Sequence, residues 1–262
     1  MKALFTIAQS FAERIHRFAS MDDLATGLEG CARELGFRHF ALLHHLDLHT
    51  AQRLTIRIDN YPTGFVEWFI EKRMFRIDPM LCASLYSNIG FAWDEVHRLI
   101  RIGPKHRTIL DQARREGLAH GITIPANIPG EAHGSCSFAC YKSVSLTDER
   151  KLAAQLVGSF AFQAARRIRY EGDYDKRQAV ELTPRQRDCV QLVAQGKTDW
   201  EIGRILGLAE DSVTKVVNAA RLRYDVANRT ELVVAALFDG EISFNEVRHW
   251  QSGYGRVRFR PE

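Results

Sequence analysis

The hydrophobic positions in the last third of the chain recur at the three- and four-residue spacings of amphipathic helices. The pattern predicts four short helices within residues 182–242. The first begins at Thr183 and Pro184, because threonine is a good N-cap and proline is favoured at the first helical position. The second, capped by Thr198 or Asp199, ends at Gly207, where a left-handed backbone is needed. Its apolar residues are Trp200, Ile202, Ile205 and Leu206.

The third predicted helix, at about 210–224, has one apolar and one polar face. Its inward residues are Val213, Val217, Ala220 and Tyr224. Its polar residues include Asp211, Thr214, Lys215, Asn218 and Arg221. Short polar and basic side chains on a supported helix suit the major groove of DNA. The polar face of any small helical bundle shows the same pattern, so periodicity alone leaves both interpretations open.

Residues 1–170 alternate between helical and strand patterns, which predicts the α/β class, with a sheet covered by helices on both faces. Helices are expected at residues 1–19, 22–35, 62–73, 106–116 and 147–170, and strands at 37–46, 54–58, 121–125 and 135–141. The inward residues of the first helix are Phe5, Ile7, Ala8, Phe11 and Ile15. The last strand has Cys136, Phe138 and Cys140 on one face and Ser135, Ser137 and Ala139 on the other.

The chain therefore divides into an α/β/α sandwich at 1–170, a charged linker at 171–180, a small all-α four-helix unit at 181–242 and a C-terminal extension at 243–262. The formal net charge is only +4, so DNA binding would depend on local charge and on two copies acting together. No apolar run reaches the ~20 residues of a membrane span. Five scattered cysteines suggest a reducing compartment, and we expect a cytoplasmic protein without membrane contact.

A group of aromatic and polar residues in the first unit suggests a chamber for a small amphipathic molecule. It comprises Tyr61, Phe65, Phe69, Asp78, Trp93, Gly121 and Ser137. The carboxylate can accept an amide N–H, while the Tyr61 and Ser137 hydroxyls can donate to carbonyl oxygens. Taken singly, each residue also fits a structural role, such as Asp78 before Pro79 as a helix cap.

Enzymatic and metal chemistry are not expected from the sequence. We find no phosphate-binding glycine loop and no Ser/His/Asp order of a hydrolase. His133, Cys136 and Cys140 suggest a metal site, but the two sulfurs of such a strand lie ~13 Å apart. His45, Asp47 and His49 alternate on one strand face, and an exposed hairpin end is the favoured interpretation. We predict no cofactor and no metal.

The helical unit resembles the DNA-binding domain of the LuxR family of transcription regulators. The resemblance lies in four motifs: Leu182-Thr183-Pro184-Arg185-Gln186, Gly196-Lys197-Thr198, Glu201-Ile202-Gly203 and Asn228-Arg229-Thr230. It implies phosphate contacts by Lys197 and Thr198, and base or backbone contacts by Ser212, Thr214, Lys215, Asn218 and Arg221. Gln186 replaces the family's glutamate, and Ala209 replaces the usual serine or threonine cap. Operator preference should therefore be unusual.

Residues 11–162 resemble the autoinducer-binding domain of the quorum-sensing members of this family, which bind N-acyl-homoserine lactones. The resemblance places Asp78 at the acceptor of the ligand amide N–H, Tyr61 and Ser137 opposite the acyl carbonyl, and Trp93 and Gly121 in the pocket. Phe65 stands where a tryptophan normally donates to the lactone carbonyl, and Phe69 where a tyrosine contacts the acyl chain. The signal is then a lactone held less tightly, or a different amide, aryl or pyrone-like molecule.

The resemblance implies a homodimer on a double-stranded DNA operator, responding to a small signal, with RNA polymerase as a further candidate partner. Two other hypotheses stay open. One is a regulator of the same family that binds DNA with its chamber empty. The other is a small-molecule-binding protein or hydrolase with an incidental helical unit.

Overall fold

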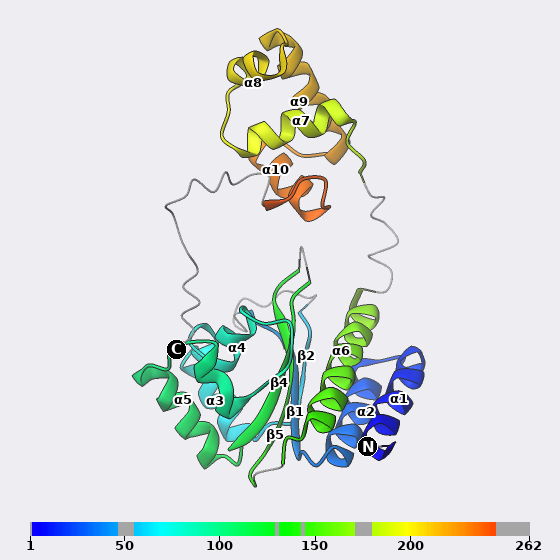
Figure 1. Cartoon of the computed structure of the whole chain (residues 1–262), viewed down its shortest axis with the longest axis vertical. Helices are drawn as coiled ribbons and strands as arrows, with labels where there is room; N and C mark the ends of the chain where they lie inside the picture. The colour runs from blue at the N-terminus through cyan, green and yellow to red at the C-terminus, as the bar shows by residue number, and fades with distance from the viewer. Residues whose placement is uncertain (1, 47–54, 129–130, 143–144, 171–179, 245–262) are drawn as a thin grey trace. The chain divides into compact units, whose positions relative to one another are not determined.

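The computed structural model describes residues 2–46, 55–128, 131–142, 145–170 and 180–244 (Figure 1). The chain divides into two compact units, Met1–Lys176 and Arg177–Glu262. The expected linker at 171–180 and the expected extension at 243–262 lie almost wholly outside the described residues, as do Asp47 and His49. No helix in the described parts of the chain is long and apolar enough to cross a membrane.

The first unit is built on a five-stranded antiparallel sheet with the order β2-β1-β5-β4-β3. The strands are β1 (His39–His44), β2 (Arg57–Asp59), β3 (Phe91–Ala92), β4 (His120–Ala126) and β5 (Gly134–Cys140). Their register aligns Asp59 with Ala41, Ala41 with Ser137, and Ser137 with Thr123. One row of residues therefore crosses four strands on the same face of the sheet. The sequence pattern anticipates four strands and misses β3, which has two residues.

Helices cover both faces of this sheet (Figure 1). On one face lie α1 (Lys2–Arg14), α2 (Met21–Glu34) and α6 (Asp148–Tyr170), and on the other lie α3 (Thr63–Glu71), α4 (Pro79–Ser84) and α5 (Pro104–Arg115). Short 3₁₀ segments occur at η1 (Ile15–Arg17), η2 (Met74–Arg76) and η3 (Trp93–Arg98). The predicted α/β/α arrangement is confirmed.

The main core of this unit lies between the sheet and the layer formed by α1, α2 and α6. The alternation predicted for β5 holds, because Cys136, Phe138 and Cys140 belong to this core. Ser135 and Ser137 face the opposite helical layer, where both line a cavity. One expectation for the first helix is wrong. Phe5 is 60% exposed, although Ala8 and Phe11 of the same helix are buried in the core as expected.

The second unit contains α7 (Pro184–Ala194), α8 (Asp199–Leu206), α9 (Glu210–Tyr224) and α10 (Arg229–Phe238). The caps follow from local sequence. Thr183 Oγ1 accepts from the Gln186 amide, Thr198 Oγ1 accepts from the Glu201 amide, and Gly207 ends α8 with φ 68°. The Gln186 side chain accepts from the Thr183 amide in return, which completes a reciprocal cap.

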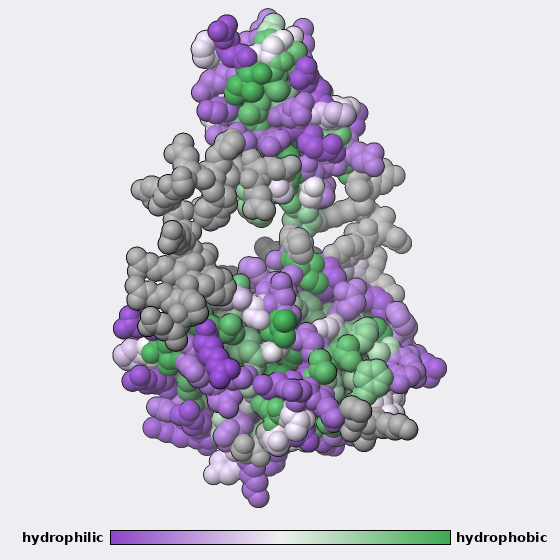
Figure 2. Space-filling model, viewed as in Figure 1, coloured by the Kyte–Doolittle hydropathy of each residue, from purple (hydrophilic) through white to green (hydrophobic). Residues whose placement is uncertain are grey.

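The core of the second unit gathers residues from all four helices, including Cys189, Val190, Ile202, Val213, Val217, Leu232 and Ala236. The four apolar residues of α8 differ in burial, and Leu206 packs against the core. Ile202 is buried, but Trp200 is 60% and Ile205 55% exposed. Only one face of a two-turn helix can meet the core. Figure 2 shows hydrophobic surface among polar residues in the region where Figure 1 draws α8 and α9.

Candidate functional site

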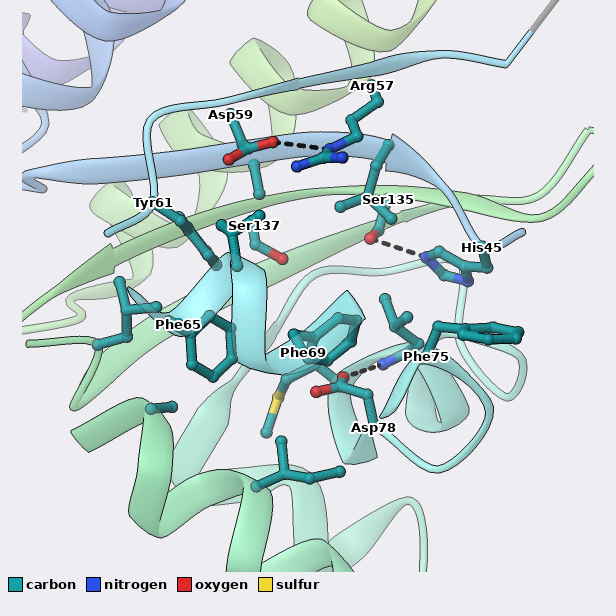
Figure 3. Close-up of a pocket in the computed structure, with 18 of the residues that line it drawn as sticks. His45, Arg57, Asp59, Tyr61, Phe65, Phe69, Phe75, Asp78, Ser135 and Ser137 are labelled. Carbon is teal, nitrogen blue, oxygen red and sulfur yellow. Dashed lines mark hydrogen bonds and ion pairs between the residues drawn. The ribbon is translucent and has the colours of Figure 1, made fainter. Parts of the chain in front are cut away.

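A cavity of about 100 Å³ lies between the sheet and the layer of α3, α4 and α5 (Figure 3). All six residues predicted from the sequence to bind a ligand line it: Tyr61, Phe65, Phe69, Asp78, Trp93 and Ser137. The lining is mostly apolar, with further contributions from Ala41, Leu43, Val66, Phe75, Met80, Leu110 and Leu118. The polar groups among these walls are few, so each one restricts what can bind.

Asp78 is held by the start of α4. It is the N-cap of that helix, and its Oδ1 accepts a hydrogen bond of 2.9 Å from the Leu81 amide. The residue is 8% exposed. Burial raises the pKa of its carboxyl to about 6, against the opposing effect of hydrogen bonds from Leu81 and Met80. The carboxyl keeps a second oxygen that can accept a hydrogen bond from a ligand.

Three aromatic side chains that line the cavity, Tyr61, Phe65 and Phe69, pack together, and Trp68 packs against Phe65 without lining the cavity. The centroid of Phe65 lies 6.2 Å from that of Tyr61, 5.6 Å from that of Phe69 and 6.0 Å from that of Trp68. Burial and the nearby Asp78 raise the pKa of Tyr61 well above its usual value, so its hydroxyl stays protonated and can donate. Phe65 and Phe69 contribute apolar surface and no donor.

Trp93 is tied into the protein by its indole N–H. Its Nε1 donates to Thr123 Oγ1 at 2.9 Å, and Thr123 Oγ1 lies 2.8 Å from Ser137 Oγ. The indole lies against Gly121, where an added Cβ would stand 2.7 Å from the ring and 2.5 Å from the Phe138 carbonyl oxygen. Trp93 therefore orients Ser137 through Thr123. The sequence interpretation missed Thr123, whose signal is its place opposite Ser137 on the neighbouring strand.

The sequence pattern places Ser135 on the same strand face as Ser137, but it does not predict that His45, Arg57 and Asp59 also line the cavity. His45 Nε2 lies 2.9 Å from Ser135 Oγ, and Arg57 Nε donates to Asp59 Oδ2 at 3.1 Å. All four residues line the cavity. The amide of His45 donates to the His133 carbonyl at 2.7 Å and its ring turns to Ser135. Asp47 and His49 lie outside the described residues, so the expected exposed hairpin end stays a prediction.

The metal hypotheses gain no support from the geometry. His133 Nδ1 pairs with Asn127 Oδ1 at 3.0 Å. Cys136 lies in the main core, on the other face of β5 from Ser135. Within the described residues, no three His, Cys, Asp or Glu side chains come together as a metal site would require.

In the helical unit, five of the seven residues predicted to contact DNA lie on α9, whereas Lys197 and Thr198 directly precede α8. Ser212, Thr214, Lys215 and Asn218 are exposed. Some of the seven also hold the fold together. Thr198 caps α8, and Thr214 Oγ1 donates to Asp199 Oδ2 at 2.6 Å.

Arg221 and Arg229 are among the arginines of this unit that have structural partners. Arg221 donates to Asn218 Oδ1 at 3.1 Å and to the Ala227 carbonyl. Arg229, from the Asn-Arg-Thr motif, donates to Asp199 Oδ1 and to the Lys197 carbonyl, both at 2.9 Å. This motif therefore fastens the start of α10 to the start of α8. Ala209 is the N-cap residue of α9 and makes no side-chain hydrogen bond to the helix, as expected for alanine.

An α/β/α unit with a small, largely apolar cavity, joined to a four-helix unit with an exposed polar helix, defines the class of ligand-binding helix-turn-helix regulators. Two family models match this arrangement. The autoinducer binding domain matches residues 20–165, and the bacterial regulatory proteins of the luxR family match residues 180–236. The chain belongs to the LuxR family of bacterial transcription regulators and carries its autoinducer-binding domain.

Several known proteins are similar over most of their length. The transcriptional activator protein VanR of Vibrio anguillarum is 31% identical, over 87% of this chain and 94% of VanR. BjaR1 of Bradyrhizobium diazoefficiens, also a transcriptional activator protein, is 24% identical, over 88% and 93%. A crystal structure of Escherichia coli SdiA shares the fold, with a TM-score of 0.61 and 22% identity. The match covers 90% of this chain and 98% of the SdiA chain. The relatives are regulators and not enzymes.

Proposed function

We propose that this protein regulates transcription by binding a small amphipathic signal in the α/β/α unit and operator DNA, as a homodimer, through α9. The signal is an N-acyl-homoserine lactone or a related amide or aryl compound. The observation that carries the proposal is the arrangement in one apolar cavity of a buried acceptor, Asp78, and hydroxyl donors, Tyr61 and Ser137. An N-acyl amide offers an N–H and a carbonyl oxygen to such a set.

Phe65 and Phe69, which stand where the resemblance expects a tryptophan and a tyrosine, are compatible with this class of ligand. With Phe65 in the wall, the lactone carbonyl loses one donor, which costs on the order of 0.5–1.5 kcal/mol, or up to about tenfold in affinity. A solved structure of SdiA in complex with octanoyl-rac-glycerol has a TM-score of 0.57 to this chain and is 22% identical to it. That compound carries an acyl chain without a lactone ring, which supports a wider ligand class for this fold.

DNA binding is proposed for the exposed side of α9. Ser212, Lys215 and Asn218 are the candidates for base and backbone contact, and Lys197 lies near the start of α8 for phosphate contact. Lys197 and Lys215 are the basic side chains in this proposed set of described residues, so two copies on a two-fold site would supply the affinity. The regulator would act in the cytoplasm, with RNA polymerase as a candidate partner of the DNA-bound dimer.

Thermal unfolding with a panel of acyl-homoserine lactones tests the ligand half of the proposal. A ligand at 100 times its Kd adds about 2.7 kcal/mol, which raises Tm by roughly 5–10 °C for a protein of this size. A matched panel of amides without the lactone ring separates the two signal classes. If no compound raises Tm while sequence-specific DNA binding persists, the protein is a regulator that works with its chamber empty. Absence of sequence-specific DNA binding would refute the regulatory half.

A further inference from the structure

We propose that the cavity contains a second polar subsite, formed by Ser135 and His45, that binds an oxygen atom in the tail of the signal. This inference rests on the proposed function and narrows its ligand. The signal would carry a hydroxyl or keto group beyond its acyl carbonyl. An unsubstituted alkyl tail would be the weaker ligand.

The geometry begins with two serines on one face of β5. Ser135 and Ser137 are two residues apart, so their positions differ by ~7 Å along the strand. Both line the cavity, and Figure 3 shows both hydroxyls on its inner side. Ser137 pairs with Thr123, and Ser135 pairs with His45. If Ser137 meets the acyl carbonyl, Ser135 meets an atom about five or six bonds further along the tail.

The protonation state and tautomer of His45 decide whether the Ser135 hydroxyl can donate a hydrogen bond to a ligand. Burial and the nearby His133 and His44 lower the pKa of His45 to about 3, so its ring is neutral at neutral pH. Among the described residues, His45 Nδ1 has no hydrogen-bond partner. A buried N–H without a partner is rarer than a buried acceptor without one, which favours the proton on Nε2. Nε2 then donates to Ser135 Oγ, and the Ser135 hydroxyl proton is free to point at a ligand oxygen.

A third group favours an oxygen at this place. Leu43 is paired with Arg57 on one side and with Ser135 on the other, so Arg57 lies in the same row of the sheet as Ser135, and both residues line the cavity. Arg57 uses Nε on Asp59. This part of the cavity therefore presents donors, which an alkyl tail would desolvate without replacing their hydrogen bonds to water.

The test compares matched ligand pairs on the full chain. Hexanoyl and 6-hydroxyhexanoyl homoserine lactone form one pair, and cinnamoyl and 4-hydroxycinnamoyl homoserine lactone form the other. The Kd of each is measured by calorimetry, with a reporter dose response as a second readout. In the wild type we expect the hydroxylated member of at least one pair to bind about three- to tenfold more tightly.

Two variants locate the effect. In Ser135→Ala, the ratio of the two Kd values should fall to about one, and His45→Phe should act in the same direction. Ser137→Ala is the matched control, since it should weaken both members and keep the ratio. Equal binding of both members by the wild type, or a ratio that survives Ser135→Ala, would overturn the subsite alone. Failure of every compound to bind would instead overturn the lactone as the signal, and with it the subsite for the tail of such a lactone.

Discussion

Replacing Asp78 with asparagine separates the helix-capping role of this residue from its proposed role in binding. Asparagine is as good an N-cap as aspartate, so its amide oxygen can keep the hydrogen bond from Leu81 that starts α4. The group left to face the signal is then an NH₂, which is a donor where aspartate has an acceptor. The variant should therefore fold, and it should bind the ligand more weakly.

The expected loss follows from the kind of hydrogen bond removed. A hydrogen bond to a charged group contributes about 1.5–3 kcal/mol, so Asp78→Asn should weaken binding of an N-acyl amide roughly ten- to hundredfold. Stability without ligand should move in the opposite direction. A shift of the carboxyl pKa from 3.8 to about 6 corresponds to about 3 kcal/mol of destabilisation by the buried charge at neutral pH.

The sign of the pH dependence distinguishes binding by the charged carboxylate of Asp78 from a loss of steric fit in the variant. The folded pKa of Asp78 lies above its unfolded value, so the folded state binds more protons between about pH 4 and 6. The contribution of Asp78 to ligand-free stability is therefore greatest below pH 4 and is lost as the pH rises through 6. Ligand affinity should show the reverse trend, falling about tenfold at pH 5, because the protonated carboxyl has lost its charge.

The assay is calorimetric binding and thermal unfolding from pH 5 to pH 8 for both proteins. Asp78→Asn should bind weakly, lose the affinity change near pH 6 and unfold at a higher temperature than the ligand-free wild type at pH 7. Two results would refute the assignment. One is wild-type affinity in the variant, and the other is the same affinity change near pH 6 in both proteins, which would assign the titration to another group.

The remaining predictions concern other parts of the chain. Gly121→Ala should lower stability by about 1–3 kcal/mol in thermal unfolding, because its methyl group would stand 2.5 Å from a backbone oxygen. Gly30→Ala is the control, because a Cβ added there would meet no atom from the rest of the described chain within 4 Å, and it should not lower the stability of the protein. Thr198→Ala removes the cap of α8 and should cost ~1 kcal/mol in denaturant unfolding. Lys197→Ala should lower the salt dependence of DNA affinity by about one counterion, and an unchanged slope argues against a phosphate contact. Phe65→Trp should raise the response of a reporter to acyl-homoserine lactones by up to about tenfold, and an unchanged dose response places the lactone elsewhere.

What the sequence predicts well is local. Thr183, Thr198 and Gly207 set helix boundaries through their own side chains or backbone freedom, and the structure places those boundaries where these residues indicate. The alternation on β5 is equally local, because a strand has two faces and Phe138 belongs inside. Such predictions need no knowledge of the rest of the chain.

What the sequence misses depends on distant pairing. His45 and Ser135 are 90 residues apart, and their hydrogen bond exists because β1 and β5 are neighbours in the sheet. Thr123 becomes informative only when its register with Ser137 is known. Trp200 shows the same limit in a helix, since the face of a two-turn helix that meets the core depends on its partners.

The polar groups of the cavity divide into those satisfied inside the protein and those left for a ligand, and the division bears on selectivity. Trp93 gives its N–H to Thr123, and Phe65 and Phe69 have none to give. We infer that recognition rests on one carboxylate and on hydroxyls such as those of Ser137 and Ser135. A hydroxyl proton rotates about its C–O bond, whereas an indole N–H is fixed in the ring plane. A pocket built this way should tolerate more carbonyl geometries than one with an indole donor, and its discrimination should lie in where along the signal the oxygen atoms occur.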